Sequence, residues 1–379
     1  MVQIIRATPC EYHNDRISVL TLTRNRPEMF KAMARSFADL ADDPSLVDIW
    51  CYVDDDDATA GPLMAYFAAN PLPVAINWMI APRPLTLGHA FNDIAVEAMN
   101  SAGYLVGFPE DFNVTMPGWD SQARRKFAAY PDGMALGFIR DPMYDDDNVK
   151  MLVVRKEWCE AVGDFLPPYF PFWFSDVWVD QISALAGRKF DIGIAITDVG
   201  GKGRTKRMWN MPFWNRFFLE TAGQRFDAVV RLLSRIHGSD AAVVRDCVAD
   251  RDGIITRMQG ELYPLQGQEP PQLVAMELKY TEESTGISPL YLAAERAALD
   301  HLQALGRPGI SGDFALAEPV SVQQQAAVVS ALMNGASFHE VGAGSADTAR
   351  RLLEWRNAYQ TGFTAGWIRQ YHKIHGTAG

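Results

Sequence analysis

The sequence is poor in cysteine and has no long hydrophobic run. Four cysteines occur in 379 residues, and no two form a CxxC pair, which disfavours a cysteine-rich zinc site. No stretch approaches the roughly eighteen consecutive apolar residues of a membrane helix. The N-terminus lacks the long apolar run after a basic start that marks a signal peptide. We therefore expect a cytoplasmic protein.

The chain is also short of positive charge. It carries 35 Lys and Arg against 46 Asp and Glu, a net charge of -11, which disfavours broad electrostatic capture of nucleic acid. Hydrophobic residues make up 48% of the sequence, which is ample for a sizeable core. The length predicts either two domains or one large domain with an appendage.

Short apolar runs alternate with helical apolar spacing in the first part of the chain. This order, β-α-β-α-β-α-β, predicts a mostly parallel, doubly wound sheet with right-handed connections. In such an α/β fold, ligands gather at the carboxyl ends of the strands. The predicted strands are residues 17–22, 49–53, 73–80 and 104–108, and the predicted helices are residues 28–40, 61–69 and 88–101.

The pattern changes in the second half of the chain, where helices dominate after about residue 213. We therefore predict an α/β domain over residues 1–212 and a mainly α-helical region over residues 213–379. The remaining predicted elements are a helix at 120–129, strands at 135–139, 150–154 and 190–197, a helix from Ser175, and helices at 213–236, 239–258, 288–305, 320–334 and 346–372.

Two of the predicted strands end in carboxylates. Glu110 and Asp111 follow strand 104–108, and Asp54–Asp57 follow strand 49–53. Carboxylates are ligands that Mg²⁺ and Mn²⁺ prefer, and a carboxylate at a strand end can accept a hydrogen bond from a base or a ribose. The alternative is a pair of solvated acidic turns. Four adjacent acids cannot all be buried, so we expect one or two to face a ligand and the others to face water.

Cations occur at two places that could reach a phosphate. Arg24 and Arg26 follow the first strand, and Lys202 and Arg204 lie in the glycine-rich segment 199–207. Guanidinium groups pair well with phosphate, and a mobile basic segment can close over a diphosphate as a lid. The alternative is that both are solvated loops that pair with nearby acids.

Two further polar residues are candidates. Asn92 lies on helix 88–101, preceded by Arg83, and either faces a bound sugar or is a helix-surface amide. Asp176 follows the aromatic segment Tyr169–Phe174, where burial would raise its pKa and suit it to general-base catalysis. The alternative for this segment is a hydrophobic core loop in which Ser175 or Asp176 caps the next helix.

These segments together resemble the GT-A fold glycosyltransferases, especially family 2-like members, over roughly half of the chain. Ile17–Glu28 is similar to the family's first strand and nucleotide loop, and Val53–Asp56 to its second strand with the uracil- and ribose-binding aspartate. Leu87–Asn92 is similar to the segment that places an Asn or Arg near the donor. Phe108–Asp111 stands where the family has its metal-binding DxD motif, and Trp173–Asp176 where inverting members have the catalytic base.

The resemblance implies a GT-A (Rossmann-like) fold and a glycosyltransferase that moves a sugar from a nucleotide-diphosphate donor, with a UDP-sugar favoured, to an acceptor hydroxyl. It implies Mn²⁺ or Mg²⁺ held by Asp111, Glu110 and Asp198, and inversion with Asp176 as general base. The motifs depart from the family in three places: Pro-Glu-Asp replaces DxD, Ser-Asp replaces Glu-Asp, and Asp198 stands where many members have His. The implied donor-binding residues are Thr21, Thr23, Arg24, Arg26, Asp54, Asp55, Asp56, Arg83, Asn92, Glu110, Lys202 and Arg204.

Two other interpretations stay open. A sugar nucleotidyltransferase of the same fold would usually carry a glycine- and lysine-rich first loop, whereas residues 23–26 contain no glycine. A non-catalytic nucleotide- or carbohydrate-binding protein on a degenerate transferase scaffold is favoured by the altered DxD and the missing His. The acceptor stays open among a glycan, a lipid-linked sugar, a protein and modified DNA. The helical region is expected, by analogy of fold, to bind the acceptor or to form homo-oligomers.

Overall fold

The computed structural model describes residues 2–8, 11–142, 147–171, 174–200, 211–260 and 289–306. The chain divides into two compact units. The first is Met1–Lys202 with Arg225–Ala249, and the second is Gly203–Gln224 with Asp250–Gly379. The predicted helices at 320–334 and 346–372 lie outside the described residues.

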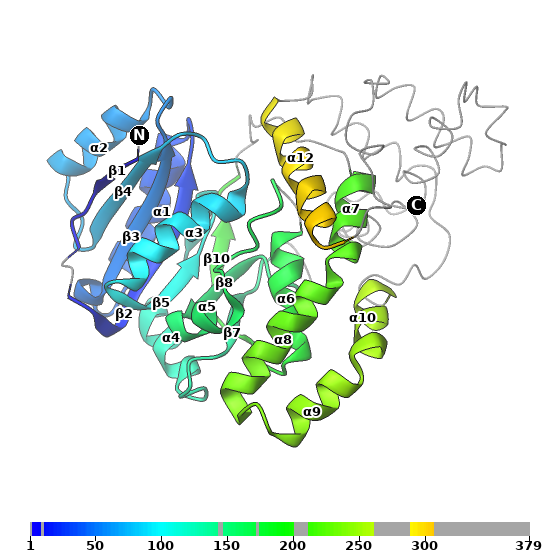
Figure 1. The fold of residues 1–379 in the computed structure, drawn as a ribbon. Coiled ribbons are helices and arrows are strands. Elements are labelled where there is room, and N and C mark those ends of the chain that lie inside the picture. Colours follow the sequence, from blue (N-terminus) through cyan, green and yellow to red (C-terminus); the bar gives the residue numbers. More distant parts are fainter. Residues whose placement is uncertain are drawn as a thin grey trace, which may run out of the picture. The chain divides into compact units, whose positions relative to one another are not determined.

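An eight-stranded sheet forms the centre of the first unit, in the order β1-β4-β3-β2-β5-β8-β7-β9 (Figure 1). Strands β4, β3, β2 and β5 are parallel, as are β7 and β9, while β1 and β8 pair antiparallel with their neighbours. The predicted α/β class with a mostly parallel sheet is confirmed. The strands are β1 Gln3–Ile5, β2 His13–Thr23, β3 Val47–Asp54, β4 Ala75–Ala81, β5 Ala102–Gly107, β7 Leu136–Ile139, β8 Met151–Arg155 and β9 Lys189–Asp191, with β6 Phe112–Val114 and β10 Ile196–Asp198 in a separate two-stranded sheet.

The strand order reverses beside β2. The chain passes from β2 to β3 to β4 in one direction and then returns to place β5 on the other side of β2. Connections that leave β2 and β5 in opposite directions open a crevice at the carboxyl ends of these strands, which is where open α/β sheets bind ligands. We call the loops that follow β2, β3, β4 and β5 the carboxyl edge.

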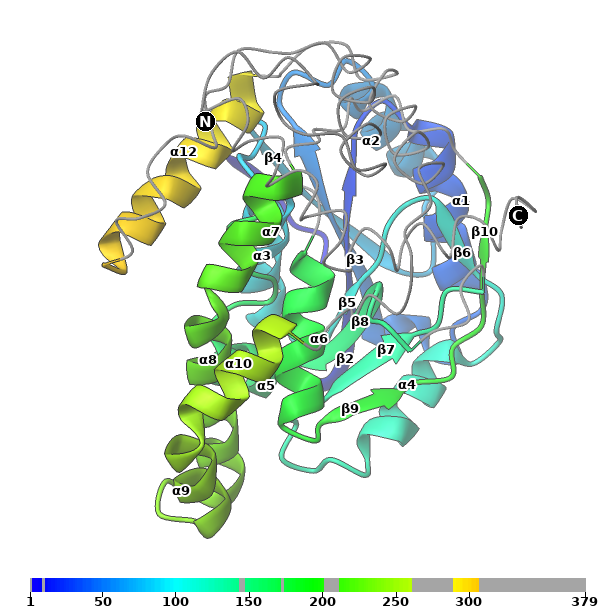
Figure 2. The same ribbon diagram turned by 90° about the vertical axis from the view of Figure 1, so that its right-hand side faces the viewer.

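Helices cover both faces of the sheet. Figure 2 shows α1 and α4 on one face and α3 and α5 on the other. Pro27 stands at the first position of α1, where its missing N–H costs no hydrogen bond. The helices of the first unit's sheet region are α1 Pro27–Asp39, α2 Ala60–Ala69, α3 Leu87–Met99, α4 Trp119–Phe127, α5 Lys156–Val162 and α6 Ser175–Leu185, and a short 3-10 turn, η1, spans Pro44–Leu46.

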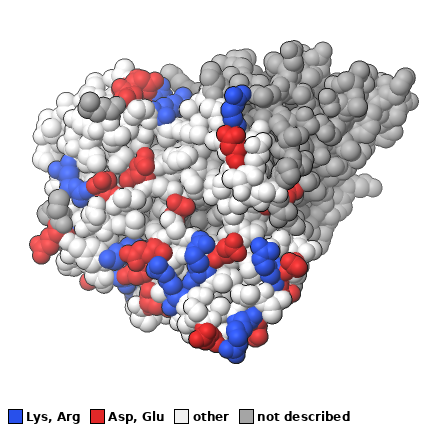
Figure 3. Space-filling model, in the orientation of Figure 1, with Lys and Arg blue, Asp and Glu red and all other residues white. Residues whose placement is uncertain are grey.

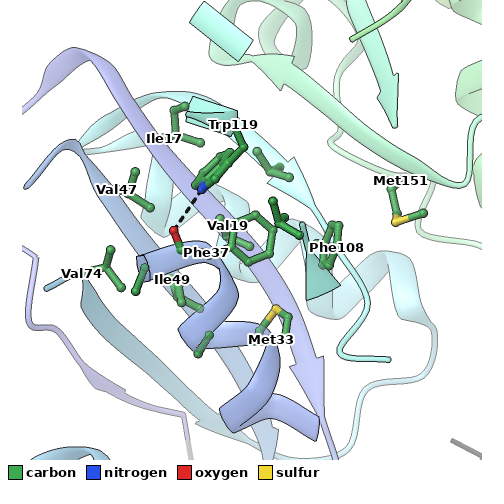
Figure 4. Close-up of a cluster of buried hydrophobic side chains, with 14 of the residues drawn as sticks. Ile17, Val19, Met33, Phe37, Val47, Ile49, Val74, Phe108, Trp119 and Met151 are labelled. Atoms are coloured by element: carbon green, nitrogen blue, oxygen red, sulfur yellow. Dashed lines mark hydrogen bonds between the residues drawn. The ribbon is translucent and has the colours of Figure 1, made fainter. Parts of the chain in front are cut away.

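The core between α1, α4 and the sheet fixes the loop that follows β5. The ring of Phe37 lies 4.8 Å from the rings of both Phe108 and Trp119, edge to face, and all three side chains are buried (Figure 4). Trp119 Nε1 donates a hydrogen bond of 3.0 Å to the carbonyl of Phe37. Burying each ring stabilises the fold by roughly 1.5–3 kcal/mol. Because Phe108 is held in this way, the backbone just before Glu110 and Asp111 is fixed in position.

Some predicted elements differ from those observed. The predicted strand 190–197 is two short strands in different sheets, because Gly193 has a φ of 74° and bends the chain between them. The predicted helix 213–236 is interrupted at Thr221, whose hydroxyl donates to the carbonyl of Phe217. Strands β1 and β6 and helix α5 were not predicted. The helices beyond residue 210 are α7 Met211–Glu220, α8 Ala222–His237, α9 Ala242–Ala249, α10 Arg251–Gly260 and α12 Pro289–Ala304.

The described helices and surface agree with the bulk composition. Within the described ranges, every helix is too short or too polar to cross a membrane. On the face shown in Figure 3, Lys and Arg side chains lie among Asp and Glu side chains over the described residues. The described residues of this face therefore form no broad basic surface of the kind that captures nucleic acid.

Candidate functional site

Backbone hydrogen bonds join the loops of the carboxyl edge. Phe108 N–H donates to the carbonyl of Leu20 at 3.0 Å, and Asp55 N–H donates to the carbonyl of Ala81 at 2.8 Å. The first bond holds the start of the β5 loop against β2, and the second holds the β3 loop against β4. Candidate residues that are distant in sequence are thereby brought to one edge of the sheet.

Arg24 connects the β2 loop to the acids after β3. Its Nη1 donates to Asp54 Oδ2 at 2.7 Å, and its Nη2 donates to Asp56 Oδ2 at 3.0 Å. Arg83 Nε, from the loop after β4, lies 3.9 Å from the same Asp54 oxygen. The bonds to Asp56 and Asp54 raise the pKa of Arg24, and the arginine lowers the pKa of exposed Asp56. Burial dominates at Asp54 and raises its pKa despite the arginine.

The other two acids of this run differ in exposure. Asp57 is buried and accepts hydrogen bonds from the N–H groups of Asn25 at 2.9 Å and Thr59 at 2.8 Å. It therefore braces Asn25, which has a φ of 57° in the left-handed region. The side chain of Asp55 is exposed to water. Asp54 and Asp56 are thus the acids of this run that the arginines contact.

Glu110 is a buried carboxylate with few partners. Its side chain lies 3.5 Å from Arg26 Nη1, and the residue is 6% exposed. Burial raises the pKa of Glu110 to about 7, against the opposing effects of the nearby Thr23 hydroxyl and of Arg26. Within the described part of the chain, neither Glu110 Oε2 nor Thr23 Oγ1 has a hydrogen-bond partner of good geometry. A buried oxygen without a partner is expected at a position where a ligand completes the bonding.

The predicted metal ligands meet only in part. In the β6–β10 pair Asp198 stands opposite Phe112, and Val199 N–H donates to the carbonyl of Asp111 at 3.0 Å. Asp198 Oδ1 accepts from Gly200 N–H at 2.6 Å. Among the described residues no three His, Cys, Asp or Glu side chains gather as a metal site. The backbone thus brings Asp198 next to Asp111, but the three predicted ligands do not form a three-ligand group.

The charge of the carboxyl edge still fits a divalent cation. Six carboxylates, Asp54 to Asp57 with Glu110 and Asp111, stand against three guanidinium groups, those of Arg24, Arg26 and Arg83. A diphosphate would add negative charge to an edge that already has an excess. Mg²⁺ is commonly bound by one or two carboxylates together with substrate phosphates, and Glu110 with Asp111 would supply such a pair.

Asp176 lies in the first turn of α6. The residue before the helix, Phe174, has a φ of 72°, and no side chain caps the helix. The prediction that Ser175 or Asp176 caps it is therefore wrong, because the helix begins at Ser175 itself. Asp176 Oδ1 accepts from Val177 N–H at 2.9 Å. Burial raises the pKa of Asp176 to about 6, against the opposing effects of Val177 N–H and the Lys150 ammonium.

The aromatic segment before α6 is mostly core. Phe170, Phe174 and Trp178 are buried, and the ring of Phe170 lies 5.6 Å from Phe174 and 5.9 Å from Trp178. Residues 172 and 173 lie outside the described residues. These buried rings pack around α6, while Tyr169 is half-buried.

Asn92 is used by a loop of the protein itself. Its Oδ1 accepts from Phe165 N–H at 3.1 Å and Leu166 N–H at 3.0 Å, and its Nδ2 donates to the carbonyl of Leu166 at 2.8 Å. Thr86, which the sequence reasoning missed, caps α3 by accepting from His89 N–H and also donates to the carbonyl of Pro168. A threonine just before a helical pattern was the available signal.

The remaining candidates have different positions. Thr21 is a buried residue of β2, and its hydroxyl has no hydrogen-bond partner among the described residues. Lys202 and Arg204 lie outside the described residues, so the lid stays a prediction. Lys150, which the sequence reasoning also missed, is placed by the start of β8, and no sequence pattern indicated it.

Comparisons with known proteins give likenesses of structure alone. No protein family and no curated protein matches the sequence. The chain is similar to the mannosyltransferase PcManGT from Pyrobaculum calidifontis in complex with GDP-Man and Mn²⁺, at 12% identity and a TM-score of 0.44, over 96% of this chain and 88% of that one. It is also similar to residues 1–349 of S. aureus TarS in complex with UDP-GlcNAc, at 10% identity and a TM-score of 0.44, over 77% of this chain and 92% of that one. Similarity of fold does not by itself assign a reaction.

Proposed function

We propose that the protein is a metal-dependent glycosyltransferase that moves a sugar from a nucleotide-diphosphate donor to an acceptor hydroxyl with inversion. The observation that carries the proposal is the convergence of Arg24, Asp54 and Glu110, from three different loops, at the strand-order reversal of the sheet. Such an edge binds ligands in open α/β sheets. A UDP-sugar is the favoured donor, because a carboxylate such as Asp54 can accept the uracil N–H.

The arginines of the carboxyl edge supply the contacts for a diphosphate. Without a ligand, Arg24 pairs with Asp54 and Asp56, and Arg26 lies beside Glu110. A guanidinium group can exchange a carboxylate for a phosphate with little change in geometry, because both are bidentate acceptors. Release of Arg24 would also free Asp54 to accept a hydrogen bond from the base or ribose.

The carboxylates after β5 would hold the cation. Asp111, with Glu110 beside it, is the pair that fits Mg²⁺ or Mn²⁺, and Asp198 is the nearest further carboxylate on the neighbouring strand. When bound, the ion neutralises charge on the diphosphate leaving group. Glu110, half-protonated near neutral pH without a ligand, would give up its proton as the cation arrives.

Asp176 would act as the general base. With a pKa of about 6, its carboxylate is mostly ionised at neutral pH and can take the proton of the acceptor hydroxyl. The acceptor oxygen then forms its bond to the anomeric carbon while the bond from that carbon to the diphosphate oxygen breaks. Attack opposite the leaving group inverts the configuration at this carbon.

Thermal-shift titration with UDP, GDP and CMP, each with and without Mn²⁺, tests the proposal. One nucleotide should raise the midpoint of unfolding, and only with the metal, because a ligand that binds the folded state stabilises it. Arg24→Ala should remove this shift, whereas Arg35→Ala, an exposed arginine of α1, should keep it. No response to any nucleotide would contradict the proposal.

A second candidate function is non-catalytic binding of a nucleotide or a sugar. The absence of a three-ligand metal group among the described residues favours it. The discriminating measurement is release of free nucleotide from the matching nucleotide-sugar. Binding without any release, with a panel of acceptors present, would support the second function over the first.

A further inference from the structure

Helix α3 holds the loop of residues 164–168, called here the anchored loop. The amide of Asn92 makes three hydrogen bonds of 2.8 to 3.1 Å to the backbone of Phe165 and Leu166. Thr86 Oγ1 donates to the carbonyl of Pro168 at 3.0 Å. A Cβ added to Gly88 would lie 2.1 Å from the carbonyl oxygen of Pro167, so the helix and the loop touch backbone to backbone.

The bonding capacity of Asn92 is largely taken up by this loop. A primary amide offers two acceptor lone pairs and two donor hydrogens. Both lone pairs face loop N–H groups, one hydrogen faces the carbonyl of Leu166, and Asp164 Oδ1 lies 3.4 Å from the same nitrogen. Asn92 therefore acts on the chain and has little capacity left for a sugar.

The anchored loop leads directly into the packing of α6. Tyr169 and Phe170 follow the loop, and their rings lie 5.5 Å and 5.9 Å from the ring of Trp178. Trp178 stands two residues after Asp176 on the same helix. The guanidinium of Arg225 on α8 lies 4.9 Å from the Trp178 ring, so this side chain is enclosed by more than one element.

The start of α6 needs such support. Phe174 has a φ of 72°, a left-handed conformation that costs a residue with a side chain about 1–3 kcal/mol. A segment with that cost keeps its position only where its surroundings hold it. Misplacing a catalytic group by roughly 1 Å can cost about a hundredfold in rate, so the position of this helix start matters for a general base.

We propose that Asn92 is a positioning residue, which sets the place of Asp176 relative to the carboxyl edge by fixing the anchored loop to α3. The proposal rests on the proposed function, in which Asp176 is the general base. Helix α3 begins just after the loop that carries Arg83, whose Nε lies 3.9 Å from Asp54 Oδ2, so the helix that holds the anchored loop follows directly on a loop of the carboxyl edge. Direct contact of Asn92 with the donor sugar is the alternative that the experiment separates.

The experiment compares Asn92→Ala with Asn100→Ala, an exposed asparagine at the other end of α3. Hydrogen exchange of the Phe165 and Leu166 amides reports the anchor directly, and initial rates of nucleotide release report turnover. Asn92→Ala should speed exchange at both amides and lower kcat roughly 10- to 100-fold with KM for the donor nearly unchanged. The apparent pKa on the acid side of the pH–rate profile of Asn92→Ala should also change, because the surroundings of Asp176 change. Asn100→Ala should behave as the wild type does.

Three results would overturn the proposal. A loss expressed in KM for the donor would assign Asn92 to direct donor contact, and an unchanged kcat with faster amide exchange would make the anchor purely structural. A wild type that binds a donor but never turns it over contradicts the proposed function itself, which distinguishes that failure from failure of the anchor alone.

Asn92→Asp is the second variant, for use if the alanine variant does not fold. It keeps the acceptor oxygen for the two loop amides, but the oxygen that replaces Nδ2 cannot donate to the carbonyl of Leu166 or to Asp164 Oδ1. It should lower kcat by a smaller factor than Asn92→Ala, again with KM for the donor nearly unchanged. If Asn92→Asp weakens donor binding and leaves kcat unchanged, the proposal is overturned by this variant too.

Discussion

The loops that precede the parallel strands form what we call the amino edge of the sheet. There the buried carboxylate of Asp120 accepts three hydrogen bonds, whereas the buried carboxylate of Glu110 at the carboxyl edge has an oxygen without a hydrogen-bond donor among the described residues. Asp120 accepts from the N–H groups of Asp42 at 2.8 Å and Asp43 at 3.1 Å and from Arg124 Nη1 at 2.7 Å. Burial alone would raise its pKa, but these donors outweigh burial and hold the pKa of Asp120 below its ordinary value. The two N–H donors come from the segment that precedes β3, so the carboxylate ties α4 to this edge.

Glu110 has the opposite balance. Arg26 lies 3.5 Å away, Oε2 has no partner among the described residues, and burial raises the pKa to about 7. Folding alone therefore leaves this carboxylate incompletely bonded. Buried polar groups in stable structure are nearly always satisfied, so the difference between these two carboxylates marks Glu110 as a candidate ligand group and Asp120 as a structural one.

The largest expected effect comes from removing the proposed base. Asp176→Asn should lower kcat by about 10²- to 10⁴-fold while donor affinity stays within about twofold, because the amide keeps the shape but cannot take a proton. Wild-type kcat should rise as pH passes about 6 and then level off, since only the ionised carboxylate is active. Initial rates and calorimetric donor binding check both statements.

The control for this change is Asp246→Asn, an exposed aspartate of α9. It should keep the wild-type rate and pH profile. If Asp176→Asn keeps full activity while the control does too, the general-base role of Asp176 is wrong.

The second largest effect is on stability, at the amino edge. Asp120→Ala leaves three buried or half-buried donors without their acceptor and should lower the free energy of unfolding by roughly 3 kcal/mol. The folded pKa is below the unfolded value of 3.8, so the carboxylate's contribution is present above that pH and is lost as pH falls through the folded pKa. Urea unfolding measures the loss, and nucleotide binding to the folded fraction should be unchanged. If Asp120→Ala loses nucleotide binding but keeps its free energy of unfolding, then Asp120 is not a structural carboxylate, and the two edges do not differ as described.

Much of the carboxyl edge was predictable because its signals are local. The apolar run before Asp54 predicted a strand at 49–53, and β3 is Val47–Asp54. The run before Glu110 predicted 104–108, and β5 is Ala102–Gly107. Buried parallel strands read as continuous apolar runs, and acids that follow them stand at one edge once the strand order is known.

The supports of the site depend on contacts that are distant in sequence. Asn92 bonds to Phe165, 73 positions away, and no local pattern indicates that partner. The left-handed backbone conformation of Phe174 could not be predicted either, since glycine is the residue that usually signals such a conformation. The same holds for Glu110, whose adjacency to Asp111 suggested a metal ligand but whose burial beside Arg26 depends on the loop after β2.

The smallest expected effect is a change in the pH dependence of stability on substitution of Glu110. Its folded pKa of about 7 exceeds the ordinary 4.5, so the folded state holds more protons between these values and stability falls as pH rises through this window. Glu110→Gln cannot ionise, so it should unfold with less pH dependence and be about 1–2 kcal/mol more stable than the wild type above neutral pH. Urea unfolding on either side of the window measures this, with Asp120→Asn as the matched amide control, which should be destabilised. If Glu110→Gln is destabilised at alkaline pH as well, Glu110 is a satisfied structural carboxylate like Asp120, and the Mn²⁺-dependent nucleotide shift should then survive the substitution.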